Sequence, residues 1–112
     1  VLIPAGLSTD PDFDAQEDWV GAVAIAMRMD GAIGHGADLF AQWRRRILDE
    51  GIDALFHSAP HSAKLRRVGL DDDISYCAQL DITQAVPCAI GREGAGVWVV
   101  NANAAREVGN AG

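Results

Sequence analysis

The sequence predicts a mixed α/β fold. Apolar residues recur at helical spacing through the middle of the chain, and short β-like runs lie near both ends. The chain has 112 residues, of which 49% are hydrophobic and 22% charged, and this composition is typical of a folded domain rather than a disordered segment. These observations together predict one small domain, or part of a larger one, that contains both helices and strands.

The N-terminal segment predicts a strand that runs into a turn. Residues 1–4 read VLIP, and Ala5 and Gly6 follow as the turn. A polar loop with Pro11 then occupies residues 8–14. Because a lone strand needs neighbours to pair with, and this one opens the chain without a lead-in, we interpret the sequence as part of a larger domain.

Residues 15–29 carry the strongest helical pattern in the chain. Asp14 is expected to cap this helix, and Glu17, three residues later, to complete a capping box. The apolar positions follow the spacing i, i+3, i+4, i+7 and i+8, which places them on one helical face. They are Trp19, Ala22, Val23, Ala26 and Met27.

Gly31, Gly34 and Gly36 end the first helical pattern, and four further helices are predicted between them and the C-terminal strands. The first spans residues 37–50 and is expected to end at Gly51, in the position that favours a left-handed residue. Two short helices follow, IDALFHSA, which stops before Pro60, and HSAKLRRVG. The last spans residues 71–80, and its core face is expected to contain Ile74, Cys77 and Ala78.

The C-terminal part predicts a β-hairpin. Residues 86–90 and 97–100 are β-like, and the glycine-rich residues 91–96 separate them as the turn. Pro87 lacks a backbone donor and therefore favours an edge strand. The organisation that follows is one domain over residues 1–100 and a small polar tail over residues 101–112.

Charge and cysteine content restrict the class of protein. The net charge of −7 argues against a general affinity for nucleic acid or anionic membranes. No apolar run approaches the roughly 20 residues that a membrane span requires. Cys77 and Cys88 form no CxxC pair, so we expect reduced, buried thiols in a cytoplasmic protein.

Two groups of carboxylates are candidates for a metal site. Asp71, Asp72 and Asp73 are adjacent, but neighbouring helical residues point about 100° apart, so these three are expected to complement the helix dipole instead. Glu17 and Asp18 also fit a first helical turn. They follow a strand-end loop, however, where α/β sheets bind ligands, and one or two carboxylates suffice for Mg²⁺. Both interpretations of this pair stay open.

The histidines and arginines allow weaker hypotheses. His57 and His61 have the spacing of zinc ligands on a helix, but Pro60 lies between them and no third ligand is evident. His35, between two glycines, is either a surface residue or an acid–base group. The default for the three arginines at residues 44–46 is a solvated face with contacts such as Arg45 to Asp49. The alternative for them, and for Arg66 and Arg67, is contact with a phosphate or sulfonate.

Several segments, taken in order, resemble the C-terminal half of the 2-phosphosulfolactate phosphatase family. The resemblance covers roughly residues 1–100 and rests on the order and spacing of four pieces. They are VLIPAG, EDWVGAVAIAM at residues 17–27, SAKLRRVGLDDDISYCAQLD at residues 62–81, and Val86-Pro87 followed by Gly91.

The resemblance implies a three-layer α/β/α fold whose mixed sheet is built from both halves of the family's chain. It also implies a Mg²⁺-dependent phosphatase that hydrolyses 2-phospho-3-sulfolactate to sulfolactate and phosphate, on the way to coenzyme M. Glu17 and Asp18 match the family's acidic pair, which makes them the candidate Mg²⁺ ligands. The family's Asp-x-x-Arg motif is absent, so the chain is expected to be a partial domain with no catalytic or substrate-binding residue assigned.

Two other functions remain as alternatives. One is a small non-enzymatic α/β module that binds a partner, or a second copy of the chain, through an unpaired strand edge. The other is a zinc protein that uses His57 and His61. For the enzyme, the expected partner is a small anionic phosphoester, and a homo-oligomer is a further possibility.

Overall fold

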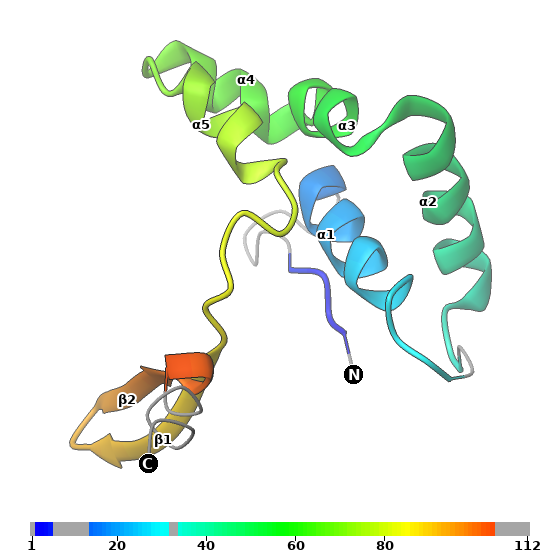
Figure 1. Ribbon diagram of the computed structural model, residues 1–112. Helices are drawn as coiled ribbons and strands as arrows, with labels where there is room; N and C mark the ends of the chain where they lie inside the picture. The colour runs from blue at the N-terminus through cyan, green and yellow to red at the C-terminus, as the bar shows by residue number, and fades with distance from the viewer. Residues whose placement is uncertain (1, 6–13, 32–33, 105–112) are drawn as a thin grey trace. The chain divides into compact units, whose positions relative to one another are not determined.

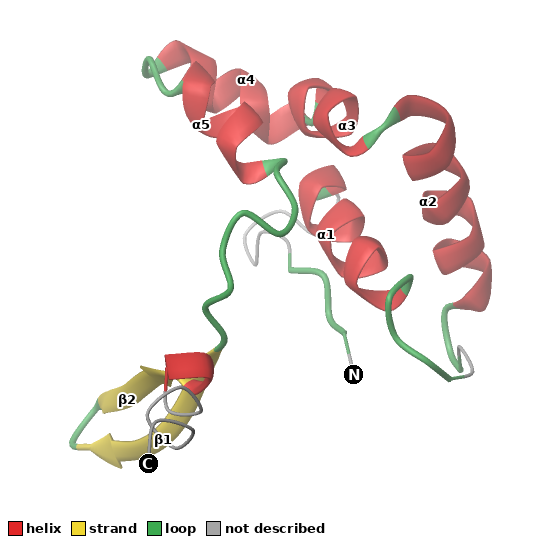
Figure 2. Ribbon diagram, in the orientation of Figure 1, coloured by secondary structure: helices red, strands yellow, loops and turns green. Residues whose placement is uncertain are grey.

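The computed structural model describes residues 2–5, 14–31 and 34–104. Contacts divide the chain into two units, and the division falls between Gln79 and Leu80. Within the described residues, the first unit contains five helices and the second contains a two-stranded sheet (Figures 1 and 2). The mixed helix-and-strand content predicted from the sequence is therefore confirmed.

The first helix, α1, spans Gln16–Ala26. The expected capping box at Asp14 and Glu17 is wrong, because Ala15 occupies the N-cap position and makes no side-chain cap. The helix begins at Gln16, so Glu17 is its second residue. A capping box needs the glutamate at the third helical position. The carboxylate of Glu17 is therefore available for another contact.

Helix α2 spans Ala37–Glu50, the range that the sequence predicts, and α3 spans Ile52–Ser58. Gly51 separates them with φ 87° and ψ 153°. Its positive φ agrees with the expected glycine at the helix end, but it takes the C-cap position and its ψ lies outside the left-handed region. Its amide still donates to the carbonyl of Ile47, and the chain then turns sharply into α3.

Two more helices complete the first unit. Helix α4 spans Pro60–Arg67 and α5 spans Asp71–Cys77. Pro60 takes the first helical position, where its missing N–H costs nothing, and Ala59 before it is extended. The three aspartates at residues 71–73 form the first turn of α5, as the dipole argument predicts.

The core of the first unit lies where α1, α2 and α3 meet (Figure 1). The indole rings of Trp19 and Trp43 stack beside it, with centroids 6.4 Å apart and planes 4° apart. The predicted face of α1 is only partly correct, because Met27 is 37% exposed. The core consists of Val20, Val23, Ile47 and Leu55, with Phe40, Trp43, Ile52 and Phe56 packed against it.

The prediction of two buried thiols is wrong, because Cys77 and Cys88 are both exposed. Ile74 and Ala78 are buried as expected, so the buried stripe of this region is only one residue wide at each turn. Cys77 lies beside that stripe and is exposed. Cys88 lies in a strand with no buried residue on either face.

The strand predicted at residues 1–4 is not formed in the part that the structure describes. Residues 2–5 have no regular secondary structure, and Ile3 is 82% exposed. A strand is defined by hydrogen bonds to a neighbour, and the only sheet of the described residues is the C-terminal hairpin. Val1, Gly6 and the predicted loop through residue 13 lie outside the described residues.

The predicted hairpin is confirmed. Strand β1, Pro87–Glu93, pairs antiparallel with β2, Gly96–Asn101, and Pro87 lies opposite Asn101. The turn is shorter than expected, because Gly91 and Arg92 belong to β1 and a bulge interrupts the pairing between Ala89 and Gly91. One helical turn follows at residues 102–104. The division into a domain at residues 1–100 and a tail at residues 101–112 stays a prediction.

None of the helices in the described ranges has both the length and the apolar character needed to cross a membrane.

Candidate functional site

The candidate metal ligands Glu17 and Asp18 lie in the first turn of α1. The Glu17 carboxylate oxygen Oε1 is 3.0 Å from Nδ1 of His61, the second residue of α4. The other oxygen, Oε2, is buried and has no hydrogen-bond partner among the described residues. A buried carboxylate oxygen without a partner is costly, so among the described residues this atom indicates a place where a ligand could bind.

Gln16 fixes the position of this turn. Its side-chain Nε2 donates to the carbonyl of Leu55 at 2.5 Å and to Oγ of Ser58 at 2.8 Å. Its Oε1 accepts from Arg46 at 3.3 Å. Gln16 is only 5% exposed, so these contacts satisfy an amide that would otherwise be buried unpaired. The first turn of α1 is thereby bound to both α2 and α3.

Besides its contact with Gln16, Arg46 makes contacts with Glu50 and Trp43. Its Nε and Nη2 donate to the two carboxylate oxygens of Glu50 at 2.7 and 3.2 Å, and its guanidinium lies 4.9 Å from the centre of the Trp43 ring. The hydrogen bond with Glu50 raises the pKa of Arg46 against the opposing effect of burial, and lowers the pKa of Glu50. Arg46 thus pairs with Glu50 on α2, whereas the sequence suggested the pair Arg45–Asp49.

The structure brings Glu17 together with a histidine and not with a group of acids. No cluster of three or more His, Cys, Asp or Glu side chains suited to a metal ion occurs within residues 2–5, 14–31 and 34–104. Mg²⁺ needs only one or two protein carboxylates when water and substrate oxygens complete its shell. The buried Oε2 of Glu17 fits one such ligand.

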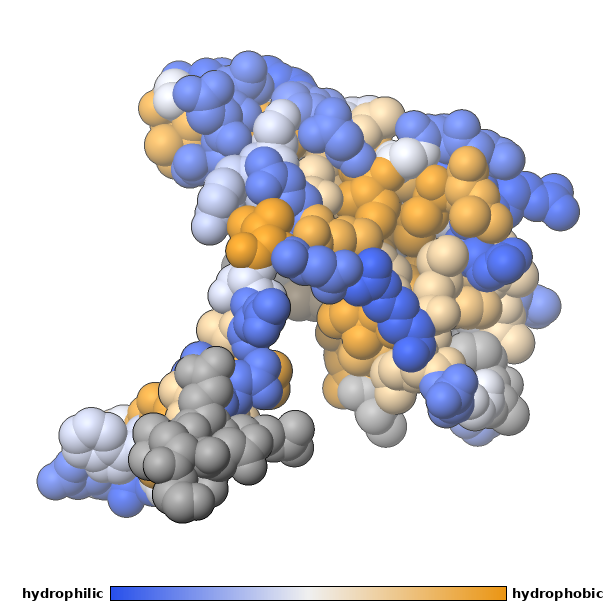
Figure 3. Space-filling model, in the orientation of Figure 1, coloured by the Kyte–Doolittle hydropathy of each residue, from blue (hydrophilic) through white to orange (hydrophobic). Residues whose placement is uncertain are grey.

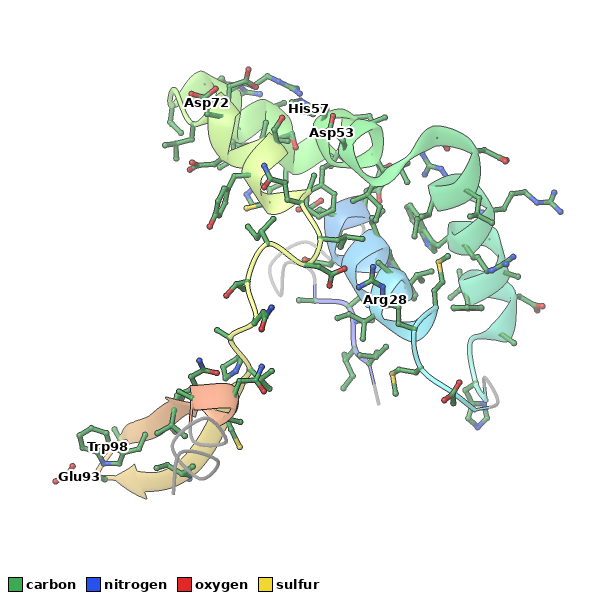
Figure 4. The ribbon with its side chains drawn as sticks, viewed as in Figure 1. Arg28, Asp53, His57, Asp72, Glu93 and Trp98 are labelled. Carbon is green, nitrogen blue, oxygen red and sulfur yellow. The ribbon has the colours of Figure 1, made fainter. Side chains whose placement is uncertain are left out.

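His57 and His61 do not share a site. His57 lies on α3 (labelled with Asp53 in Figure 4), and its Nε2 is 2.8 Å from Oγ of Ser75 on α5. Arg66 contacts Nδ1 of His57 at 3.2 Å and the His57 carbonyl at 2.7 Å. The two histidines therefore lie on different helices and contact different residues, which does not support a shared zinc site.

The contact between His57 and Ser75 looks like a base beside a nucleophile, but the hydrogen-bond roles are reversed. Arg66 is always a donor, so Nδ1 of His57 must accept its hydrogen bond. The ring proton is then on Nε2, which donates to the Ser75 hydroxyl and cannot remove its proton. Arg66 also donates to Asp71 at 3.1 Å, so these contacts join α3, α4 and α5.

An open cleft of about 570 Å³ runs along the C-terminal part of α1 and the start of α2. Trp19, Ala22 and Phe40 contribute apolar walls, and Asp30 and His35 contribute polar groups. Hydrophobic side chains gather at the surface over these two helices (Figure 3). Glu17 is not part of the cleft lining, so the cleft and the carboxylate are separate features of the first unit.

Sequence reasoning singled out Glu17 and Asp18 as candidates but did not place Gln16, Arg46 and His61 in the same region. The contacts of Gln16 reach residues 39 and 42 positions away, and that between Glu17 and His61 spans 44 positions. A pattern along the chain carries no signal for such pairs.

Comparison with known proteins identifies one family. A family model described as 2-phosphosulpholactate phosphatase matches residues 2–91. A probable 2-phosphosulfolactate phosphatase of Gloeobacter violaceus is 36% identical over 75 residues, which are 63% of this chain and 30% of that protein. A protein of the same description from a Nostoc species is 35% identical over 49 residues, which are 44% of this chain and 18% of that protein.

The chain therefore matches less than a third of the length of each of these relatives. No solved structure matches it.

Proposed function

Because this chain belongs to the 2-phosphosulpholactate phosphatase family, we propose that it contributes to a Mg²⁺-dependent phosphatase that hydrolyses 2-phosphosulfolactate to sulfolactate and phosphate. The family match over residues 2–91 carries the proposal. The proposal includes a cytoplasmic enzyme whose product leads toward coenzyme M. It also includes a three-layer α/β/α domain, to which residues 1–100 would contribute the helices described above.

We assign Glu17 and Asp18 as the residues that would hold Mg²⁺. The support for Glu17 is its buried Oε2, which has no hydrogen-bond partner in the described part of the chain and is a hard oxygen ligand of the kind Mg²⁺ takes. The support for Asp18 is the family resemblance, which pairs it with Glu17; both lie in the first turn of α1.

The bound ion would offset the negative charge that develops on the phosphoryl oxygens. The chain's own residues supply the rigidity that such chemistry needs. Gln16 ties the first turn of α1 to Leu55 and Ser58, so the carboxylate of the next residue is presented from a fixed backbone. The substrate is strongly anionic, and an arginine is the expected partner for its phosphate or sulfonate. Arg46 is already paired with Glu50, which makes it a poor candidate.

The test is phosphate release from 2-phosphosulfolactate by the protein encoded by the whole open reading frame. We expect activity that requires Mg²⁺ and disappears on chelation. Glu17→Ala should lower it at least about 100-fold, because loss of a metal contact worth several kcal/mol has that effect on rate.

Asp72→Ala is the matched control, because Asp72 is an exposed acid in the first turn of another helix, α5. It should leave the rate unchanged. Activity that survives chelation, or an equal response of the two variants, would rule out the assignment of Glu17.

A further inference from the structure

We propose that His61 is a positioning residue for Glu17, which directs carboxylate oxygen Oε2 toward a bound divalent cation by holding Oε1 in a hydrogen bond. This inference rests on the proposed function, since it assigns a second residue to the same metal site. The observation behind it is the 3.0 Å contact between Nδ1 of His61 and Oε1 of Glu17. An ionised carboxylate only accepts hydrogen bonds, so the Nδ1–H of His61 is the donor.

The backbone of His61 is fixed from both sides. Pro60 before it has a restricted φ and opens α4. Ser62 after it is 5% exposed, and its hydroxyl donates to the carbonyl of Phe56 on α3. Ala59 is also buried. The imidazole therefore reaches Glu17 from a start of α4 that is packed against α3.

Glu17 is fixed in the same way. Gln16, its neighbour in the chain, is hydrogen-bonded to Leu55 and Ser58 of α3. The two partners of the pair thus belong to helices that are each held against α3, and their separation does not depend on a flexible loop. A hydrogen bond between side chains so placed restricts rotation of the carboxylate.

The restriction explains why Oε2 is buried without a partner. If the carboxylate were free to rotate, it would turn that oxygen toward water instead of leaving it unsolvated. Ligating carboxylates in metal sites are commonly oriented by such outer hydrogen bonds, and losing one typically weakens metal binding about 10–100-fold. In Glu17, Oε1 is the oxygen held by His61, and Oε2 is the oxygen left to bind the cation.

Binding of Mn²⁺ to the whole protein, measured by electron paramagnetic resonance, tests the inference independently of activity. Mn²⁺ accepts the same oxygen ligands as Mg²⁺. His61→Ala should weaken binding about 10-fold. His61→Asn places an amide nitrogen close to the position of Nδ1 and should restore it, whereas His61→Gln places the amide nearer the Nε2 position and should not.

His57→Ala is the matched control, because His57 lies four residues earlier and contacts Ser75 and Arg66 instead of α1. It should bind Mn²⁺ like the wild type. His61 is 48% exposed at its side chain, so its variants are expected to fold, and thermal unfolding checks this. If His61→Ala does not fold, His61→Asn and His61→Gln are compared instead. Equal Mn²⁺ affinity of these two variants would overturn the positioning role.

A double-mutant cycle separates this inference from the proposed function. If His61 acts through Glu17, adding His61→Ala to Glu17→Gln should cause no further loss of Mn²⁺ affinity. An additional loss equal to that of the single variant would overturn the positioning role. Normal affinity in Glu17→Gln would overturn the metal site itself, while a loss in Glu17→Gln without one in His61→Ala would overturn only the role of His61.

Discussion

Gln16 shows how much of the first unit depends on one polar side chain. Its amide joins the start of α1 to a backbone carbonyl and a hydroxyl on α3, and to Arg46 on α2. Few residues in the chain are more deeply buried, yet it lies one position before the acidic pair. Its role is therefore both structural and, through Glu17, relevant to the proposed site.

We predict that Gln16→Leu destabilises the protein by about 1–3 kcal/mol, because it removes the buried hydrogen bond to the Leu55 carbonyl and a second, partly buried one to the Ser58 hydroxyl. Urea unfolding measures this change. Gln42→Leu, at an exposed position of α2, is the control and should change stability by less than about 0.5 kcal/mol. Equal effects of the two substitutions would show that the buried hydrogen bonds contribute nothing.

The pair Arg46–Glu50 predicts a pH dependence of stability. The hydrogen bond from Arg46 lowers the pKa of Glu50, so the folded state binds its proton less readily than the unfolded state does. The contribution of the pair is therefore present above the ordinary glutamate pKa and is lost as the pH falls through the lowered value. Both groups are substantially exposed, which keeps the effect small and sensitive to salt.

Unfolding free energy measured against pH checks this sign. Glu50→Gln should lose less stability than the wild type on going from neutral to acid pH. Asp49→Asn, which removes the neighbouring carboxylate on α2, should follow the wild-type curve. A steeper acid loss in Glu50→Gln would contradict the assigned direction.

At the scale of residues, the sequence correctly placed the aspartates of α5 by their local electrostatics. It singled out Glu17 and Asp18 through a resemblance, and their role as metal ligands stays a prediction. It failed for the thiol of Cys77, because burial depends on which side of a short helix meets another element. The contact of Glu17 with His61 joins distant parts of the chain, so no local rule predicts it.

At the scale of elements, the turn between α2 and α3 depends on glycine. Gly51 has φ 87° and ψ 153°, a backbone region that is essentially restricted to glycine. A Cβ added there would meet no atom within 4 Å. Any cost of substitution at Gly51 must then come from the backbone itself and not from crowding.

Gly51→Ala should therefore destabilise the protein by about 1–3 kcal/mol. The control is Gly21→Ala, since Gly21 is inside α1 and a Cβ there also meets nothing within 4 Å. Alanine in a helix interior is favoured over glycine, so this variant should gain about 0.5–1 kcal/mol. Thermal or urea unfolding gives both values, and changes of the same sign would contradict the conformational argument.

The sequence predicted helices more reliably than strands for a physical reason. Helix α2 forms over the predicted range because its hydrogen bonds are local and Gly51 marks its end. The hairpin was predictable because its two strands are close in sequence. The expected strand at residues 1–4 required a distant partner, and the described residues supply none beside it.

At the scale of the whole chain, the unusual property is the amount of apolar surface left uncovered. Within the first unit, Leu2, Ile3, Ile25 and Met29 are each at least 40% exposed, and the second unit has no buried residue in either strand. Exposed apolar side chains over both units are visible in Figure 3. Such surface is typical of an interface, so the chain alone is expected to associate.

We predict that the 112-residue chain associates in a concentration-dependent way, which sedimentation velocity measures as a rising mean mass. The net charge of −7 opposes association, so added salt should strengthen it by screening that repulsion.

Ile25→Asp should weaken association, because Ile25 is 54% exposed on α1 and its replacement removes apolar contact without touching the core. Gln42→Asp, at an exposed position of α2, adds the same negative charge without an apolar change and serves as the control. A sharp monomer at every concentration and salt level would contradict the prediction and favour a self-contained module, whereas association abolished by salt would show that charge, not apolar surface, holds the copies together.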